Sequence, residues 1–233
     1  VPFISKVINV PLAKLATRIM TGKTLAQLGF TQSVRPGFFA VKESVFPFSR
    51  FQGIDATLGP EMRSTGEVIG IDSNFEMAYA KSQLAAGQKL PVSGSIFISV
   101  KDKDKPASAS IARGFKEMGF DIFASSGTGK YLVGKGLDVR IIPKVYEGER
   151  PNIVDYMKNN KISLIINTPS GKKTKKDITS IRSIAVNRNI PLITTIPGAR
   201  ATLVAIKKIR EDDISVRSIQ EYHGDLKNRN GSE

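Results

Sequence analysis

The sequence predicts an α/β protein in which a doubly wound, parallel five-stranded sheet follows a mixed α+β segment. Between residues 95 and 212, short β-branched runs alternate with helical patterns of about a dozen residues. Such alternation is typical of parallel strands that are joined by right-handed crossovers, with helices on both faces. Before residue 90 the pattern is irregular. We therefore expect two domains, residues 1–90 and 91–212, and a polar C-terminal tail over residues 213–233.

The first segment opens with a helical pattern and an extended stretch. Pro11 suits a first helical turn, Asn9 is a candidate cap and Gly22 ends the pattern. Residues 33–47 alternate as a half-buried strand does. The apolar positions are Leu12, Leu15, Ala16 and Ile19 in the helix, and Phe38, Phe39, Val41, Val45 and Phe46 in the extended stretch.

A long polar loop and a second helix complete this segment. Residues 52–70 are rich in Gly, Pro and polar side chains, which predicts a loop. Ser73 and Glu76 have the spacing of a capping box, so a helix is expected after them, and Gly87 ends it. Residues 87–94 are expected to be a linker.

Five strands are expected in the regular part of the chain. They lie at residues 96–100, 120–123, 139–142, 164–166 and 192–194. Helices are expected at residues 106–118, 153–157, 178–185 and 202–209. From Asp225 onward the chain is polar, and we expect it to be frayed.

Composition excludes several classes of protein. The chain has no cysteine and a single histidine, His223, so thiolate, Cys-zinc and His-centred chemistry are not expected. No apolar run approaches the roughly 20 residues of a membrane span, and no leader pattern opens the chain. We expect a cytoplasmic protein without a membrane partner.

The net charge of +14 raises nucleic acid as a partner. The basic excess, however, is spread over the whole chain, and Lys172, Lys173, Lys175 and Lys176 form its one local cluster. No zinc-finger, helix-turn-helix or aromatic base-stacking pattern is present. We therefore expect no nucleic-acid partner, and the diffuse charge is interpreted as a solvated surface.

Three loops that follow strands have the composition of anion sites. Residues 125–130 combine hydroxyls, glycines and Lys130, residues 167–171 precede the lysine cluster, and Lys144 follows the third strand. Carboxyl ends of parallel strands meet at one sheet edge, where ligands bind. Ordinary turns with solvated lysines are the alternative for each loop. Because three loops share the bias, a small phosphorylated ligand is the preferred interpretation.

This site is predicted to bind its ligand without transforming it. Residues 125–130 are not a Walker motif, because Ala124 stands at the first glycine position and Tyr131 at the magnesium-binding Ser/Thr position. The loops carry no evident acid/base pair of carboxylates. Asp177 is a lone carboxylate at a helix start, where capping explains it. We expect no catalytic residue and no metal site.

Several longer segments resemble the large chain of carbamoyl-phosphate synthase. They are Val1-Pro-Phe-Ile-Ser-Lys, Val10-Pro-Leu-Ala-Lys, Val41-Lys-Glu-Ser-Val-Phe-Pro-Phe, Leu58-Gly-Pro-Glu-Met-Arg-Ser-Thr-Gly-Glu-Val-Ile-Gly, Lys144-Val-Tyr-Glu-Gly and Ile165-Ile-Asn-Thr-Pro-Ser-Gly-Lys-Lys. The resemblance extends over about residues 1–212. It implies that residues 1–90 close the second, carbamate-phosphorylating ATP-grasp unit, and that residues 91–212 are an allosteric domain with a methylglyoxal-synthase-like fold.

The resemblance also implies an activity and partners. The family makes carbamoyl phosphate from bicarbonate, glutamine-derived ammonia and ATP, with Mg or Mn, for arginine and pyrimidine biosynthesis. The family's metal-binding segment would precede Val1, so this piece is expected to be non-catalytic and to hold no cofactor. The implied partners are the remainder of the large chain, the glutaminase small subunit and a small phosphorylated effector, with oligomerisation possible through the allosteric domain.

Two regulatory sites carry over from the resemblance. The nucleotide-monophosphate site, for UMP or IMP, corresponds to Lys105, Ser125, Thr128, Lys144, Asn167 and Asp177. The ornithine-like site corresponds to Glu43, Leu58 and Thr194. The chain departs from the family pattern at Pro169 and Leu192, which replace a threonine and a tyrosine, and it lacks the tryptophan of acetylglutamate-activated relatives.

A stand-alone lyase of the methylglyoxal-synthase type is the alternative. The predicted fold suits that reaction, which acts on a triose phosphate. Its chemistry uses a catalytic Asp assisted by a His in the pocket, and His223 lies outside the α/β segment. The regulatory interpretation is therefore preferred.

Overall fold

The computed structural model describes residues 1–45, 66–143, 145–168 and 175–230. Its larger part is a five-stranded sheet in which every neighbouring pair of strands is parallel. The strands are β3 (Ser95–Ser99), β4 (Asp121–Ser125), β5 (Arg140–Ile142), β6 (Leu164–Asn167) and β7 (Leu192–Ile193). Their order is β5-β4-β3-β6-β7. The chain thus winds outward from β3 first to one side and then to the other, which confirms the doubly wound prediction.

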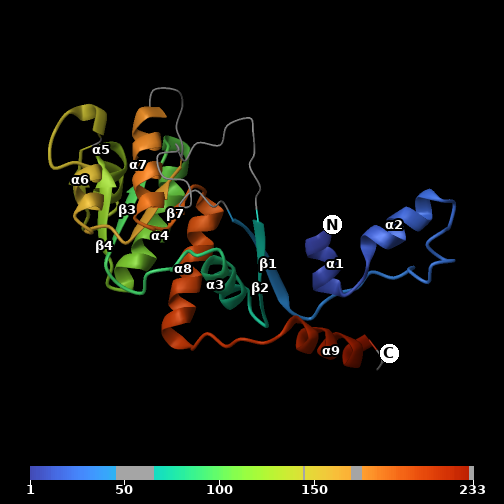
Figure 1. Ribbon diagram of the computed structural model, residues 1–233. Coiled ribbons are helices and arrows are strands. Elements are labelled where there is room, and N and C mark those ends of the chain that lie inside the picture. Colours follow the sequence, from blue (N-terminus) through green and yellow to red (C-terminus); the bar gives the residue numbers. More distant parts are fainter. Residues whose placement is uncertain (46–65, 144, 169–174, 231–233) are drawn as a thin grey trace.

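Helices cover both faces of this sheet (Figure 1). They are α4 (Lys105–Glu117), α5 (Ser126–Val133), α6 (Ile153–Lys158), α7 (Lys175–Asn187) and α8 (Ile196–Glu211). Short 3₁₀ turns at Asp102–Asp104 and Val145–Glu147 follow β3 and β5. Successive strand residues point to opposite faces, so a strand that is buried on both sides is apolar throughout. This explains the continuous β-branched runs of the sequence.

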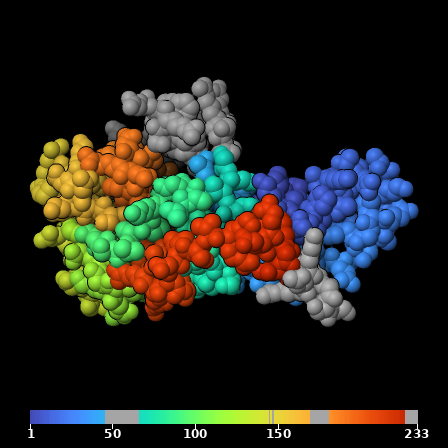
Figure 2. Space-filling view, turned by 60° about the horizontal axis from the view of Figure 1, so that its bottom comes forward, coloured from blue at the N-terminus to red at the C-terminus, as the bar shows by residue number. Residues whose placement is uncertain are grey.

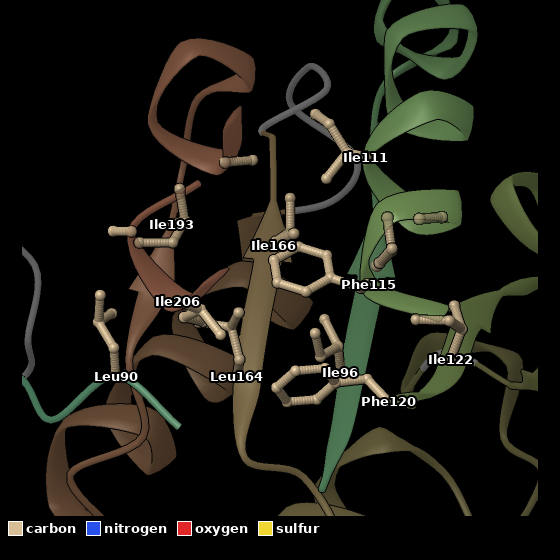
Figure 3. Close-up of a cluster of buried hydrophobic side chains, with 14 of the residues drawn as sticks. Leu90, Ile96, Ile111, Phe115, Phe120, Ile122, Leu164, Ile166, Ile193 and Ile206 are labelled. Atoms are coloured by element: carbon tan, nitrogen blue, oxygen red, sulfur yellow. The ribbon is translucent and has the colours of Figure 1, made fainter. Parts of the chain in front are cut away.

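Strand β3 shows how the two faces are filled. Ile96 and Ile98 point into one core cluster, together with Phe115 of α4 and Ile206 of α8 (Figure 3). Phe97, between them in sequence, points into the other cluster, with side chains of α6 and α7. All three strand residues are at most 1% exposed. The central strand therefore fixes the helices of both layers.

The residues before β3 form a smaller unit. It contains α1 (Pro2–Ile8), α2 (Leu12–Met20), β1 (Phe39–Val45), β2 (Gly66–Asp72) and α3 (Phe75–Ala85). Strands β1 and β2 pair antiparallel, with Glu43 opposite Val68. Helix α3 packs on this hairpin and also on α8, so it joins the two sheets.

Four expectations for this unit are corrected. Residues 66–70, predicted as loop, belong to β2, and the rest of the predicted loop lies outside the described residues. Helix α1 was not expected. Asn9 does not cap the second helix. Instead it ends α1 in the left-handed conformation, with φ of 55°. The cap of α3 is Asn74 rather than Ser73, since the Asn74 side chain accepts a hydrogen bond of 2.8 Å from the Met77 amide.

The C-terminal segment is also more ordered than expected. Helix α9 (Ile219–Asn230) continues past Asp225, so the expectation of a chain frayed from that residue is wrong as far as Asn230. The Tyr222 side chain is buried, and its hydroxyl donates to the Ile71 carbonyl at 3.1 Å. The His223 Nε2–H group donates to the Lys6 carbonyl at 2.6 Å. Figure 2 shows α9 in red against the blue N-terminal segment. Helix α9 thus packs on the N-terminal unit and contacts both α1 and β2.

No helix in the described ranges is both long and apolar enough to cross a bilayer.

Asp72 is the most heavily bonded carboxylate of the hairpin and gives a pH prediction. Burial alone would raise the pKa of this carboxyl, but hydrogen bonds from Lys81, Asn74 and Ser73 outweigh it and hold that pKa below its ordinary value. The Lys81 Nζ atom lies 2.7 Å from Asp72 Oδ2. The charged form is therefore favoured in the folded state. Its contribution to stability is present above about pH 4 and is lost as the pH falls through the native pKa.

We expect Asp72→Asn to flatten the loss of stability on acidification, as measured by urea unfolding between about pH 6 and pH 3. Asp138→Asn is the control. The Asp138 carboxylate is also paired, with Lys116 at 2.8 Å, but its side chain is 90% exposed, so a smaller change is expected. Parallel stability curves for Asp72→Asn and wild type would contradict the assignment.

Candidate anion-binding site

Polar side chains gather where the three central strands end. Ser99 ends β3, Ser125 ends β4 and Asn167 ends β6, and Ser99 is aligned with Asn167 in the sheet. The Ser99 hydroxyl donates to Ser125 Oγ at 2.9 Å. The structure thus brings predicted site residues from separate loops to one edge, as the parallel topology requires.

Thr128 ties this edge to the first turn of α5. Its hydroxyl oxygen lies 3.4 Å from Ser125 Oγ and accepts a hydrogen bond of 3.1 Å from the Val100 amide. Ser125 and Thr128 are 2% and 1% exposed. Buried hydroxyls with such partners have fixed orientations. Ser125 and Thr128 therefore mainly stabilise the structure of this edge, because their hydroxyls already have partners within the protein.

Two further residues contribute to the edge. Ser99 was not predicted as a site residue, and Thr168 lies in the predicted loop at residues 167–171 but was not singled out. The Thr168 amide donates to the Ser99 carbonyl at 3.2 Å, and its hydroxyl oxygen accepts from the Lys101 amide at 3.1 Å. Thr168 thus fastens the loop after β3 to the end of β6. Their position at the carboxyl ends of predicted strands was the available signal, because that position alone marks a ligand-facing edge.

The predicted phosphate loop at residues 125–130 is in fact a helix start. Helix α5 begins at Ser126, directly after the strand, with Ser125 as its N-cap. No side-chain hydrogen bond caps this end. The first backbone N–H groups of a helix lack intrahelical partners and carry partial positive charge, so this end favours an anion.

The two glycines of α5 have different roles. A Cβ atom on Gly127 would meet Lys105 Nζ at 3.5 Å and no other atom within 4 Å, so Lys105 lies over an open first turn. A Cβ atom on Gly129 would lie 2.6 Å from Ile141 Cγ1, so Gly129 lets the helix pack closely on β5. Gly127 therefore leaves the first turn open beside Lys105, whereas Gly129 serves the packing of α5 on β5.

Two predicted groups of this site lie outside the described part of the structure, and the side chain of a third is not described. Lys144 falls in a gap, and so do Pro169 and the following residues through Thr174. Asp177 lies within α7, and its side chain is not described. Of the predicted nucleotide-site residues, the structure thus brings together Ser125, Thr128 and Lys105 around the start of α5, with Asn167 on the strand beyond Ser99.

The ornithine-like set is divided between the two sheets. Glu43 is on β1, where Gln83 Nε2 of α3 donates to its carboxylate at 2.8 Å, and Thr194 follows β7. Leu58 is outside the described residues. Helix α3 packs on both β1 and α8. The Tyr79 hydroxyl of α3 lies 3.1 Å from Thr202 Oγ1 of α8 in a buried hydrogen bond.

Glu43 and Tyr79 are electrostatically coupled at this junction. Burial raises the pKa of the Tyr79 phenol, the hydrogen bond with Thr202 lowers it, and the negative charge of Glu43 adds to the rise. The phenol therefore stays neutral at physiological pH and can donate its proton. The charge of Glu43 therefore acts on Tyr79, and Tyr79 is hydrogen-bonded to Thr202 of α8, the helix that follows Thr194.

The described Asp, Glu and His side chains form no group of three that could hold a metal ion. His223, the sole histidine of the sequence, lies on α9 beside Lys6 and not at the carboxyl edge of the sheet. What the edge offers is a helix amino end, a lysine and fixed hydroxyls. Groups of this kind favour negatively charged ligands.

The chain is similar to one domain family and to large chains of carbamoyl phosphate synthase. A family model described as the MGS-like domain matches residues 108–194. A carbamoyl phosphate synthase large chain from Nostoc is 51% identical over 95% of this chain and 20% of its own length. The arginine-specific, chloroplastic large chain from Oryza sativa is 50% identical over 95% of this chain and 19% of its own length.

A relative named as a C-terminal section is also similar. The carbamoyl phosphate synthase large chain, C-terminal section, of Methanocaldococcus jannaschii is 45% identical over 98% of this chain and 39% of its own length. The chain thus spans about a fifth of the first two relatives and about two-fifths of the third. Among solved structures, methylglyoxal synthase from Elizabethkingia anophelis is 17% identical, with a TM-score of 0.41, over 49% of this chain and 79% of its own.

Proposed function

We infer that this chain belongs with the large chains of carbamoyl phosphate synthase and forms a regulatory, C-terminal part of one. About 50% identity over 95% of the chain supports the family, and the MGS-like match covers β4 to β7, four of the five strands of the sheet. The observation that carries the regulatory role is the anion-binding edge, where Lys105 lies over the first turn of α5 at the amino end of that helix.

The whole enzyme's activity is part of this proposal. A large chain of this family would use ATP with Mg or Mn to make carbamoyl phosphate from bicarbonate and glutamine nitrogen, for arginine and pyrimidine biosynthesis. Residues 1–90 would contribute the end of an ATP-grasp unit, and a glutaminase subunit would supply ammonia. The cytoplasm is the compartment expected from the resemblance. The role proposed for this chain is to bind effectors and pass the effect on.

Helix α2 supports the remainder of a large chain as partner. Its apolar positions recur at helical spacing, yet none of its side chains is buried. Ile19 is 41% exposed and Met20 is 87% exposed. Figure 1 shows this helix at the far side of the N-terminal unit from the five-stranded sheet. An amphipathic helix usually buries its apolar face. The four-fifths of the relatives that this chain does not span would provide the cover.

A nucleotide monophosphate is the ligand proposed for the sheet edge. Its phosphate would lie at the amino end of α5, beside Lys105, where the helix dipole and the ammonium both favour negative charge. Asn167 and the hydroxyl edge would face the rest of the ligand. UMP and IMP are the candidates that follow from the resemblance.

Calorimetry with UMP, IMP and the nucleosides uridine and inosine tests this site. We expect the nucleotides to bind and the nucleosides to bind more weakly. Lys105→Ala should weaken nucleotide binding by about tenfold or more, because a charge-assisted hydrogen bond contributes about 1.5–3 kcal/mol. Lys116→Ala, at the far end of α4, removes the same charge and should have little effect. No heat with either nucleotide at millimolar concentration would contradict the proposal.

An ornithine-like amino acid is proposed for the second site, with Glu43, Leu58 and Thr194. The coupling from Glu43 through Tyr79 to Thr202 favours it, because a ligand amine on Glu43 would change the charge beside that hydrogen bond. An effect on domain packing of about 1–3 kcal/mol is typical of such coupling. Leu192→Tyr, which restores the family residue, should strengthen ornithine binding.

The lyase alternative gains no support from the structure. The position of His223 beside Lys6 leaves the sheet edge without an imidazole. An assay for methylglyoxal from dihydroxyacetone phosphate separates the two functions, and we expect no product.

A further inference from the structure

Two carboxylates contact groups of the site that the proposed function assigns to a phosphate: Asp102 pairs with Lys105, and Glu147 accepts from Ser126 of α5. Asp102 comes from the turn after β3 and Glu147 from the turn after β5, so two separate loops bring negative charge to one helix end. We propose that Asp102 and Glu147 are internal counter-anions of the effector site, which hold Lys105 and Ser126 until the ligand's phosphate displaces them. This inference rests on the proposed nucleotide site and adds the groups that tune its affinity.

Asp102 neutralises the lysine of the site. Its Oδ1 atom lies 2.7 Å from Lys105 Nζ, the same ammonium that lies over Gly127. The Lys105 side chain is 20% exposed, whereas that of Asp102 is 94% exposed. The aspartate can therefore swing into water with little loss of packing, while the lysine stays over α5. An incoming phosphate would take the place of a single exposed carboxylate.

Glu147 does the same at the helix end itself. Ser126 is the first residue of α5, and its hydroxyl donates to Glu147 Oε2 at 3.1 Å. Glu147 is exposed, as is this hydrogen bond. A carboxylate is stabilised next to a helix amino end by the same dipole that favours a phosphate. Glu147 thus uses a donor that a ligand would need.

The consequence is competition inside the site. A ligand must break the Lys105–Asp102 and Ser126–Glu147 contacts before it makes its own, so we expect an affinity lower than the site's donors would allow. A phosphate monoester carries nearly two negative charges, and each carboxylate carries one. The phosphate therefore displaces them, whereas the uncharged nucleoside cannot. The two carboxylates are therefore expected to affect the binding of the ligand's phosphate and not the binding of its base.

The proposal is tested by neutralising Asp102 and Glu147 one at a time in the intact 233-residue chain. We expect Asp102→Asn and Glu147→Gln each to tighten UMP and IMP binding by about two- to fivefold, the range of an exposed ion pair. Uridine and inosine binding should not change. Asp138→Asn is the matched control, because it removes an equally exposed, lysine-paired carboxylate from the loop before β5, at the opposite end of the sheet. It should leave nucleotide binding within twofold of wild type.

A double variant separates competition from a structural role. If Asp102 acts by occupying Lys105, then Asp102→Asn should bring no gain in a Lys105→Ala background. Weaker or unchanged nucleotide binding in Asp102→Asn and Glu147→Gln, with binding to wild type intact, would overturn the inference and leave the nucleotide site standing. An equal gain in Asp138→Asn would also overturn it. No nucleotide binding to wild type or to any variant would overturn both.

Discussion

A Gly70→Ala variant is expected to lose at least about 3 kcal/mol of folding free energy, at the upper end of the cost of overpacking a core. Gly70 lies on β2, where α3 crosses it, and an added Cβ atom would collide with the Ala78 carbonyl oxygen and the Ser82 amide nitrogen. Both are backbone atoms of α3, so no side-chain rotation can relieve the collision. Helix α3 would have to move away from the hairpin.

Gly66→Ala on the same strand is the control for this prediction. A Cβ atom there would meet Val45 Cβ at 3.6 Å, an ordinary van der Waals distance. Chemical denaturation of the two variants and wild type measures the difference. The melting temperature of Gly70→Ala should fall by roughly 6 °C or more, given about 2–4 °C per kcal/mol for a chain of this size. Equal stability of the two variants would show that α3 does not lie this close to β2.

A Tyr222→Ala variant is expected to lose about 3 kcal/mol and to loosen the N-terminal unit. The Tyr222 ring is 8% exposed, with its centroid 5.3 Å from that of Phe38 and with Arg217 stacked 4.6 Å above it. Truncation of a buried aromatic residue to alanine typically costs about 3–5 kcal/mol. Because α9 contacts α1 and the hairpin, the loss should be local to them.

Hydrogen exchange locates the effect of this change. Amides of α1 and β2 should exchange faster in Tyr222→Ala, while those of β3 and β6 should keep their protection. Tyr222→Phe keeps the ring and removes only the hydrogen bond to Ile71, so its cost should be about 1 kcal/mol. If exchange became faster uniformly across the chain, or did not become faster anywhere, α9 would not be the element that holds α1 and β2 in place.

The five-stranded sheet was predictable because its signal is local. The apolar runs of β3, β4 and β6 and the helical spacing of α4 and α8 are written in consecutive residues. The parallel arrangement follows from their alternation, since a helix between two strands returns the chain to the same end. Once strands are parallel, their carboxyl ends share one edge, which is why Ser125 and Asn167 could be assigned to one site.

The hairpin strand β2 and helix α9 could not be predicted in the same way. Residues 66–72 contain two glycines and alternate weakly, and they become a strand because β1 pairs with them. Helix α9 is polar for most of its length, and it is held by Tyr222, which finds its partners 151 residues away at Ile71. Long-range contacts of this kind leave no mark in the local pattern.

By itself, the sequence determined the α/β class, the positions of the five parallel strands and the hydroxyl-rich edge at which they end, because each depends on side-chain periodicity within a short stretch. Tertiary structure alone decided that Gly129 packs while Gly127 stays open, that Ser99 and Thr168 complete the edge, and that Asp102 pairs with Lys105 while Glu147 accepts from Ser126. Those facts depend on distances between segments that are far apart in the chain, and the spacing of residues along the sequence does not specify such distances.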